Sequence, residues 1–183
     1  PRVAFFEAIS PVDAGPFSSK GARGVFQSQL AILEEATKKG HSVLILEDDV
    51  DFVSGAQDYE LPEGWSIFYG GHYAANPEDL QNSDIIGAHM MGFTAEAAWR
   101  VYTYLNTLSF TGIHPPIDGA YIWFRRAHPD VRTVFAVPPL GNQRPSRTDI
   151  ADLRFFDRLP GFRHAATFAR KLKRRHQRAT RQA

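Results

Sequence analysis

Three consecutive acidic residues follow the most apolar segment of the chain. Glu47, Asp48 and Asp49 come directly after residues 42–46, which read Ser-Val-Leu-Ile-Leu. Carboxylates crowded at the end of a buried strand repel one another and lose hydration, so a cation would stabilise them. Hard oxygen ligands select Mg²⁺, Mn²⁺ or Ca²⁺, and an ion held by one or two carboxylates keeps positions for a substrate diphosphate. The tripeptide also fits a solvated acidic loop, and both interpretations stay open at this point.

Helix and strand patterns alternate along the chain, and they must position these carboxylates. The 42–46 segment is apolar without alternation, which is typical of a strand covered on both faces in a parallel-type sheet. Ser18 and Ser19 precede a helix pattern over residues 22–39, and Gly40 ends it. This order of elements predicts the α/β class. The other expected elements are an extended or strand segment over 3–9, strands over 65–69 (closed by Gly70 and Gly71), 85–91 and 133–137, helices over 95–108 (capped by Thr94) and 117–127, and loops over 72–83 and 140–149.

The charge of the chain is divided between two unlike parts. The net charge of the 183 residues is +1, but residues 1–162 hold 13 basic and 20 acidic side chains, whereas residues 163–183 hold eight basic and no acidic ones. An acidic body disfavours nucleic acid as a partner. The basic tail over residues 161–183 fits either a solvated C-terminus or a peripheral anchor on an anionic membrane surface.

The composition excludes several other classes of protein. The absence of cysteine excludes disulfide scaffolds, zinc–thiolate sites and thiol nucleophiles. No apolar run approaches the roughly 20 residues that span a bilayer, which excludes a transmembrane helix. We expect the protein in the cytoplasm. The chain begins at Pro1 without a methionine or a signal-peptide pattern, so we expect that sequence has been removed or left out upstream.

An ordered set of motifs over about residues 3–160 resembles glycosyltransferase family 25, which includes lipooligosaccharide and collagen galactosyltransferases. Its signature is a glycine-containing helix that bears Ser-His, followed about fifteen residues later by a hydrophobic strand that ends in Leu-Glu-Asp-Asp. The matching segments are GARGVFQSQLAILEEA (21–36), VLILEDDVDF (43–52), GWSIFYGGHY (64–73), GAHMMGFTAEAAWRVYTYL (87–105), PIDGAY (116–121) and PPLGNQRPSRTDI (138–150).

The resemblance implies a single domain over residues 1–160 with a GT-A-type, Rossmann-like fold that binds a nucleotide-sugar. It implies a hexosyltransferase that uses Mn²⁺ or Mg²⁺ and moves galactose or glucose from a UDP-sugar, with inversion, to a glycan or glycolipid acceptor such as lipopolysaccharide. An enzyme that builds such an acceptor would act on the inner face of the membrane, where the basic tail could hold it.

The resemblance also distributes roles among individual residues. Glu47 and Asp49 point the same way if strand geometry persists and would share the metal ion, although Asp48 with Asp49 is the alternative pair if the chain has already turned. Asp48 would otherwise accept a hydrogen bond from the ribose or the donor sugar. Asp118 is either the base that deprotonates the acceptor or a plain helix cap. The remaining donor-site candidates are Gly24, Ser28, His72, Gln143, Ser146 and Asp149.

Two departures from the family pattern leave alternative functions open. Gln29 stands where the family has histidine after the serine, and the family's first, nucleotide-contacting strand would lie upstream of Pro1. These departures would suit a degenerate, non-catalytic binding module. A Mg²⁺-dependent phosphate-handling enzyme would use the same acidic strand end, although the chain lacks a phosphate-binding glycine loop ending in Gly-Lys-Ser/Thr.

Overall fold

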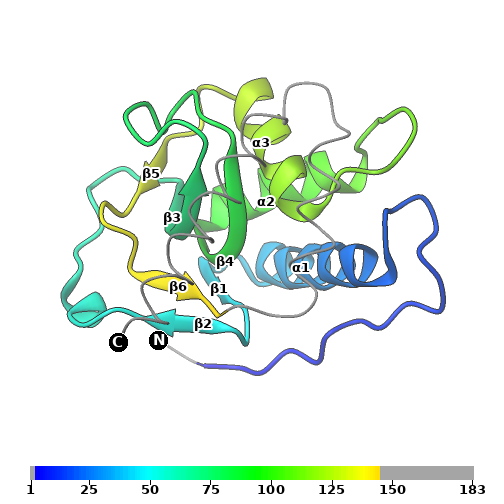
Figure 1. Ribbon diagram of the computed structural model, residues 1–183, viewed down its shortest axis with the longest axis horizontal. Helices are drawn as coiled ribbons and strands as arrows, with labels where there is room; N and C mark the ends of the chain where they lie inside the picture. Colours follow the sequence, from blue (N-terminus) through cyan, green and yellow to red (C-terminus); the bar gives the residue numbers. More distant parts are fainter. Residues whose placement is uncertain (1–2, 145–183) are drawn as a thin grey trace, which may run out of the picture.

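A computed structural model describes residues 3–144, and three helices and six strands form its framework (Figure 1). Ser146, Asp149 and the basic tail over 161–183 lie outside the described residues. The elements are α1 (Lys20–Lys39), β1 (Val43–Leu46), β2 (Val50–Phe52), a short 3-10 helix (Ala56–Asp58), β3 (Ile67–Ala74), β4 (Ile85–Phe93), α2 (Ala95–Asn106), α3 (Ile117–Ala127), β5 (Thr133–Phe135) and β6 (Gly141–Gln143).

The main sheet has four strands in the order β1-β4-β3-β5, and its pairing is mixed. β4 is antiparallel to both β1 and β3, and only β3 with β5 is parallel. The expectation of a parallel-type sheet around residues 42–46 is therefore wrong, because β1 is an edge strand. Its residues Leu44 and Leu46 are 50% and 44% exposed, so the apolar run is not covered on both faces. The class is nevertheless α/β, as predicted.

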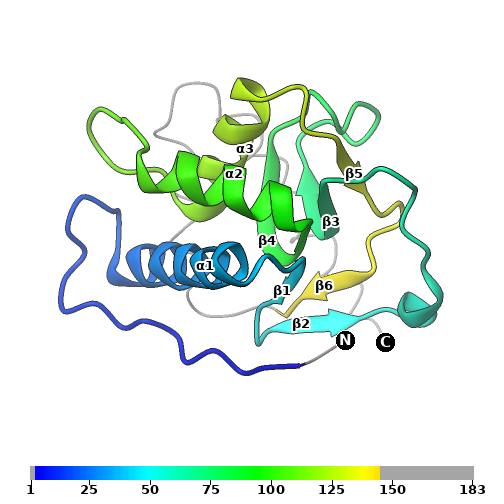
Figure 2. The same ribbon diagram turned by 180° about the vertical axis from the view of Figure 1, so that it is seen from behind.

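The three helices cover one side of the main sheet, as the two opposite views show (Figures 1 and 2). The core between helices and sheet is apolar, and Leu33, Met91, Ala98 and Val101 are fully buried there. Caps set the helix ends as expected. The Ser19 hydroxyl accepts from the amide of Ala22, Gly40 ends α1 with a φ of 62°, and the Thr94 hydroxyl accepts from the amide of Ala97.

A second, two-stranded sheet lies where a loop was expected. β2 and β6 pair antiparallel, with Val50 opposite Gln143 and Phe52 opposite Gly141. A smaller apolar cluster of Phe68, Met90, Ala136 and Leu140 lies against this ribbon, with Val50 packed on it. The ribbon matters for function because it brings the 140–143 segment to the end of β1.

β3 continues through Gly70 and Gly71, where a strand end was predicted. A side chain at Gly71 would lie 2.2 Å from Nε2 of His89, and one at Gly70 would lie 2.6 Å from Sδ of Met90. These glycines therefore allow the side chains of β4 to lie against the backbone of β3. They mark close packing inside the sheet, and not its boundary.

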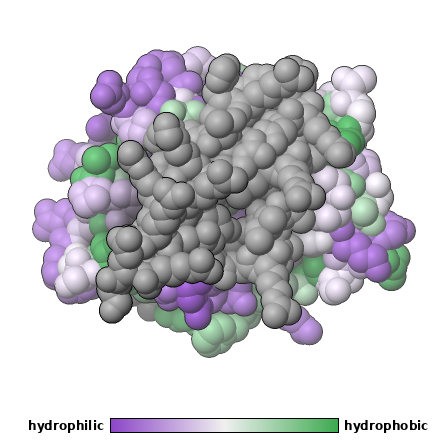
Figure 3. Space-filling view, in the orientation of Figure 1, coloured by the Kyte–Doolittle hydropathy of each residue, from purple (hydrophilic) through white to green (hydrophobic). Residues whose placement is uncertain are grey.

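The segment before α1 is extended but pairs with no strand among the described residues. It runs alongside α1 in both ribbon views (Figures 1 and 2), and its residues Val3 and Phe5 are almost fully exposed. No helix within residues 3–144 is long and apolar enough to cross a membrane. On the face seen in Figure 3, the described residues in view are a mixture of hydrophilic and hydrophobic side chains.

Candidate functional site

The chain turns immediately after β1, and this turn presents the acidic residues. The amide of Glu47 still donates to the carbonyl of His89 (3.0 Å), but the amide of Val50 donates back to the carbonyl of Glu47 (3.2 Å). Glu47 and Asp49 are half-buried, whereas Asp48 is exposed. Strand geometry thus does not persist beyond β1. The carboxylates of Glu47 and Asp49 nevertheless lie near enough for Asp49 to raise the pKa of Glu47.

Glu47 points toward the helical layer, where a glutamine holds it. Nε2 of Gln29 donates to Oε1 of Glu47 (3.0 Å), and the Tyr121 hydroxyl donates to Oε1 of the same glutamine (2.7 Å). Burial raises the pKa of Glu47 to about 7, with further increases from Asp49 and Asp118, while the Gln29 hydrogen bond opposes them. The buried Tyr121 therefore supports the acidic group through Gln29.

Asp49 is fixed on one oxygen only. Its Oδ2 accepts from Nε2 of Gln143 (3.0 Å) across the β2–β6 ribbon, and its carbonyl accepts from the amide of Arg144 (2.8 Å). Its other oxygen, Oδ1, is buried without a hydrogen-bond partner. Gln143, a predicted donor-site residue, thus binds the carboxylate of Asp49 in this structure.

Asp118 comes to the same place from the first turn of α3. Oδ2 accepts from the amide of Gly87 on β4 (3.3 Å), and Oδ1 accepts from the amide of Gly119 (2.9 Å). Pro116 is the N-cap residue of α3, so Asp118 is not the cap itself. The carboxylate thus ties the helix to β4 and adds its charge to the environment of Glu47.

His89, on β4, is a central residue that is absent from the predicted site residues. It is fully buried, and its Nε2 donates to the carbonyl of Gly141 (3.1 Å), which leaves Nδ1 unprotonated in the neutral ring and without a partner. A side chain at Gly87 would lie 2.9 Å from that Nδ1, just as one at Gly71 would meet Nε2. Gly71 of β3 and Gly87 of β4 therefore make the space for this imidazole, and they were the sequence signal for it.

His72 lies on β3, away from the carboxylates and against aromatic rings. Its imidazole meets Phe135 edge-on at 5.3 Å and Tyr69 at 6.4 Å between centroids. Burial lowers its pKa to about 4, with smaller effects from His89 and Arg125, so the ring is neutral at physiological pH. The structure gives the predicted donor-site residue a buried, unpartnered Nδ1.

Gly24 and Ser28 make their contacts with the N-terminal segment. The hydroxyl of Ser28 accepts from the amide of Ile9 (2.8 Å), and a side chain at Gly24 would lie 2.6 Å from the carbonyl oxygen of Ile9. Both residues hold that segment against α1. The neighbouring Gln29, noted only as a departure from the family pattern, is the α1 residue that reaches the acidic group.

A divalent cation fits part of this arrangement. Within residues 3–144, no three His, Asp or Glu side chains converge closely enough to hold a metal ion by themselves. The Glu47–Asp49 pair could supply two ligands, since Oδ1 of Asp49 is buried without a partner and the carboxyl of Glu47 is crowded by negative charge. Two protein carboxylates with substrate oxygens completing the shell is a common arrangement for Mg²⁺.

No family model, curated protein or solved structure matches the chain. A functional assignment therefore rests on the chemistry of the residues at the end of β1.

Proposed function

We propose that the protein is a metal-dependent glycosyltransferase with a GT-A-type fold that moves a hexose, galactose or glucose, from a UDP-sugar to a glycan or glycolipid such as lipopolysaccharide. One observation carries the proposal: Glu47, Asp49 and Asp118 converge in a partly buried site although they come from two distant segments, and one oxygen of Asp49 has no partner. Buried carboxylates without compensating cations destabilise a fold, so their convergence favours a functional role.

Glu47 and Asp49 would hold Mn²⁺ or Mg²⁺. The ion would supply Lewis-acid stabilisation of the diphosphate leaving group. Gln29 orients the carboxyl of Glu47 and Gln143 orients that of Asp49, so both ligand side chains are fixed before substrate binds. Asp48, exposed beside them, remains available to the ribose or the donor sugar.

Asp118 would act as the base for inverting transfer. It would take the proton from the acceptor hydroxyl as the new bond forms from that oxygen to the sugar C1, while the bond from C1 to the phosphate oxygen breaks and UDP leaves. Its two backbone hydrogen bonds orient the carboxylate for this task.

We place the enzyme in the cytoplasm, at the inner face of the membrane. The net charge of +8 over residues 163–183, which lie outside the described residues, supports attraction to anionic lipid.

Isothermal titration of UDP-galactose and UDP-glucose, with and without Mn²⁺, tests the proposal. We expect binding that requires Mn²⁺ and that Asp49→Ala abolishes. Asp51→Ala is the matched control, because Asp51 is an exposed carboxylate on the same segment whose side chain pairs with Arg144. Equal UDP-sugar affinity of wild type and Asp49→Ala would overturn the assignment. UDP-sugar binding without any sugar transfer would favour a non-catalytic binding module.

A further inference from the structure

His89 is a fully buried polar residue in the middle of β4. Its imidazole donates from Nε2 to the carbonyl of Gly141 on β6 (3.1 Å), whereas Nδ1 has no hydrogen-bond partner within residues 3–144. Burying a polar ring with one of its two nitrogens unpaired costs free energy. The adjacent Met90 and Met91 are also buried, and a side chain like theirs would occupy β4 without that cost. The imidazole therefore needs an explanation other than packing.

The carbonyl that His89 binds belongs to the strand that holds Asp49. Two residues further along β6, Nε2 of Gln143 donates to Oδ2 of Asp49 (3.0 Å). A side chain at Gly71 would lie 2.8 Å from the carbonyl oxygen of Gly141, so β6 lies closely against β3 at this point. β6 has only 3 residues, and a hydrogen bond at its first residue therefore also limits where Gln143 can lie. The side chain of His89 is thus connected to the carboxylate of Asp49.

The backbone of His89 holds the other residue of the proposed ligand pair. Its carbonyl accepts from the amide of Glu47 (3.0 Å), just beyond the last paired position of β1, where Leu46 lies opposite Met90. The acidic turn therefore begins at a hydrogen bond to His89. One residue of β4 thus contacts both segments that determine where the ligand pair lies, through its carbonyl on one side and its imidazole on the other.

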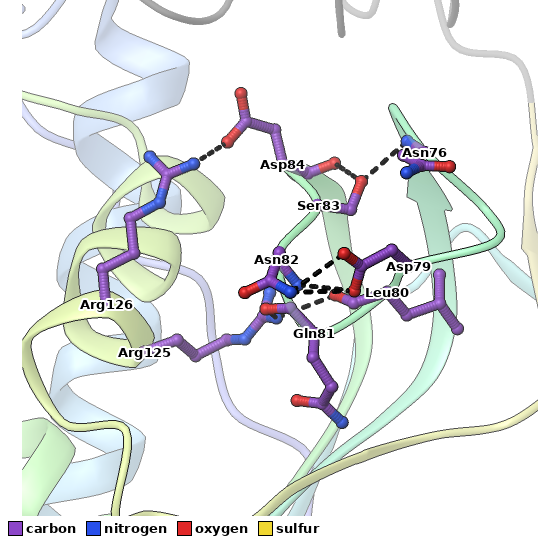
Figure 4. A network of polar contacts seen from close by, with 9 residues as sticks. All are labelled: Asn76, Asp79, Leu80, Gln81, Asn82, Ser83, Asp84, Arg125 and Arg126. Atoms are coloured by element: carbon purple, nitrogen blue, oxygen red, sulfur yellow. Dashed lines mark hydrogen bonds and ion pairs between the residues drawn. The ribbon is translucent and has the colours of Figure 1, made fainter.

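The other edge of the imidazole lies against the backbone that orients Asp118. A side chain at Gly87 would lie 2.9 Å from Nδ1 of His89, and the amide of Gly87 donates to Oδ2 of Asp118 (3.3 Å). The chain is fixed to α3 just before this point, where Arg126 pairs with the carboxylate of Asp84 at the start of β4 (Figure 4). The imidazole therefore lies between β6 and the backbone that contacts the proposed base.

We propose that His89 is a positioning residue that sets the spacing of the three carboxylates of the site. It acts on Asp49 through β6, on Glu47 through its own carbonyl, and on Asp118 through the backbone of Gly87. The inference rests on the proposed function for the identity of the bound cation, Mn²⁺ or Mg²⁺. Replacing a residue that orients metal ligands typically weakens metal binding by about 10- to 100-fold.

Titration with Mn²⁺ alone, followed by the electron paramagnetic resonance signal of the free ion, tests the effect on the ligand pair. We expect His89→Leu to weaken Mn²⁺ binding about 10-fold or more, because β6 loses its donor. His89→Gln should restore most of the affinity, since its amide nitrogen can donate to the same carbonyl. His114→Leu is the matched control and should bind Mn²⁺ as wild type does. His114 is likewise buried, but its Nδ1 donates to the carbonyl of Pro115 (2.8 Å).

A double-mutant cycle distinguishes positioning from a general loss of stability. If His89 acts on Asp49 through Gln143, the losses of Mn²⁺ affinity in His89→Leu and Gln143→Leu should not add in the double variant. Thermal unfolding checks that each variant is folded at the temperature of the titration. Additive losses would overturn the proposal, as would a loss in His89→Leu that His89→Gln does not restore.

Amide hydrogen exchange measures the position of β6 directly, in protein without metal. The amides of residues 141–144 should exchange faster in His89→Leu than in wild type, because the hydrogen bond that holds β6 to β4 is lost. In His89→Gln they should exchange at close to the wild-type rate. Equal exchange in wild type and His89→Leu would overturn the proposal, whether or not the protein binds Mn²⁺.

The positioning role and the proposed function can fail separately. If wild type binds no Mn²⁺ while exchange of residues 141–144 depends on His89, the positioning role stands and the metal-dependent function falls. If Asp49→Ala abolishes Mn²⁺-dependent binding of UDP-sugar while His89→Leu binds Mn²⁺ as wild type does, the function stands and the positioning role falls.

Discussion

The layer between the helices and the main sheet differs from the polar end of that sheet in how its buried groups are satisfied. In the helical layer, Leu33, Ala98 and Val101 are fully buried among apolar neighbours. At the end of β1, Glu47 and Asp49 are drawn together despite their like charge, and buried polar atoms lack partners. The first region supplies the stability that allows the second to hold its groups in an unfavourable arrangement, as functional sites commonly do.

The largest effect should come from Asp118, the proposed base. We expect Asp118→Asn to slow sugar transfer by about 10²–10⁴-fold, because the general base is lost. Nucleotide binding should persist, since Asp118 is not a proposed metal ligand. UDP release from UDP-galactose or UDP-glucose with lipopolysaccharide and Mn²⁺ measures the rate. Asp58→Asn, an exposed carboxylate, is the control, and a rate near that of wild type for Asp118→Asn would remove its catalytic role.

A substitution in the helical layer should lower the stability of the protein and leave its nucleotide binding unchanged. Leu33→Ala leaves a cavity in a fully buried position, and we expect a loss of about 2–5 kcal/mol in the free energy of unfolding. The Mn²⁺-dependent affinity for UDP should be unchanged in the folded variant. Leu44→Ala, at a position that is 50% exposed, is the control and should cost much less. Loss of UDP affinity in folded Leu33→Ala would contradict the division between the two regions.

Glu47 should make the polar end of the sheet sensitive to pH in metal-free protein. Its pKa is raised from 4.5 to about 7 by burial and by Asp49 and Asp118. Its contribution to stability is therefore fully present below pH 4.5 and is lost as the pH rises through 7. Glu47→Gln should be the more stable protein at pH 8, by up to about 3 kcal/mol, because no buried charge forms.

The opposite dependence of His72 sharpens this measurement. Burial lowers its pKa from 6.5 to about 4, so its contribution is present above pH 6.5 and is lost as the pH falls through 4. In wild type the two groups oppose each other between pH 4.5 and 6.5. Glu47→Gln should therefore lose stability toward acid more steeply than wild type, as measured by urea unfolding in EDTA. Glu63→Gln, an exposed position, should follow the wild-type curve.

Local signals predicted the helices well. The hydroxyls of Ser19 and Thr94 and the left-handed Gly40 act at the ends of helices that the spacing of apolar residues had located. The bounds of α3 agree fully with the expectation over 117–127. These features depend on residues within a few positions of one another, so the sequence carries them directly.

The sheet and the site depend on contacts between distant residues, and there the prediction was partly wrong. The apolar run in β1 does not reveal that Leu44 and Leu46 face outward on an edge strand. The three-residue strands β2 and β6 are too short to show a pattern, yet they bring Gln143 to Asp49 across 94 positions of sequence. Sequence reasoning found the carboxylates from their type, whereas their supporting residues, such as Gln29, needed the fold.

Two buried tyrosines provide the smallest and most direct test of the difference between satisfied and unsatisfied polar groups. The Tyr121 hydroxyl donates to Gln29, whereas the Tyr69 hydroxyl makes no hydrogen bond of normal length and has the Arg125 guanidinium as its polar neighbour, and both residues are almost fully buried. Tyr121→Phe should cost about 1–3 kcal/mol of unfolding free energy, because it leaves Oε1 of Gln29 without its donor. Tyr69→Phe should cost nothing or stabilise the protein, because it removes a desolvated hydroxyl and keeps the ring stacked on Phe135. Urea unfolding of both variants without ligand gives the comparison, and equal losses would show that the two hydroxyls are equally well satisfied in the folded protein.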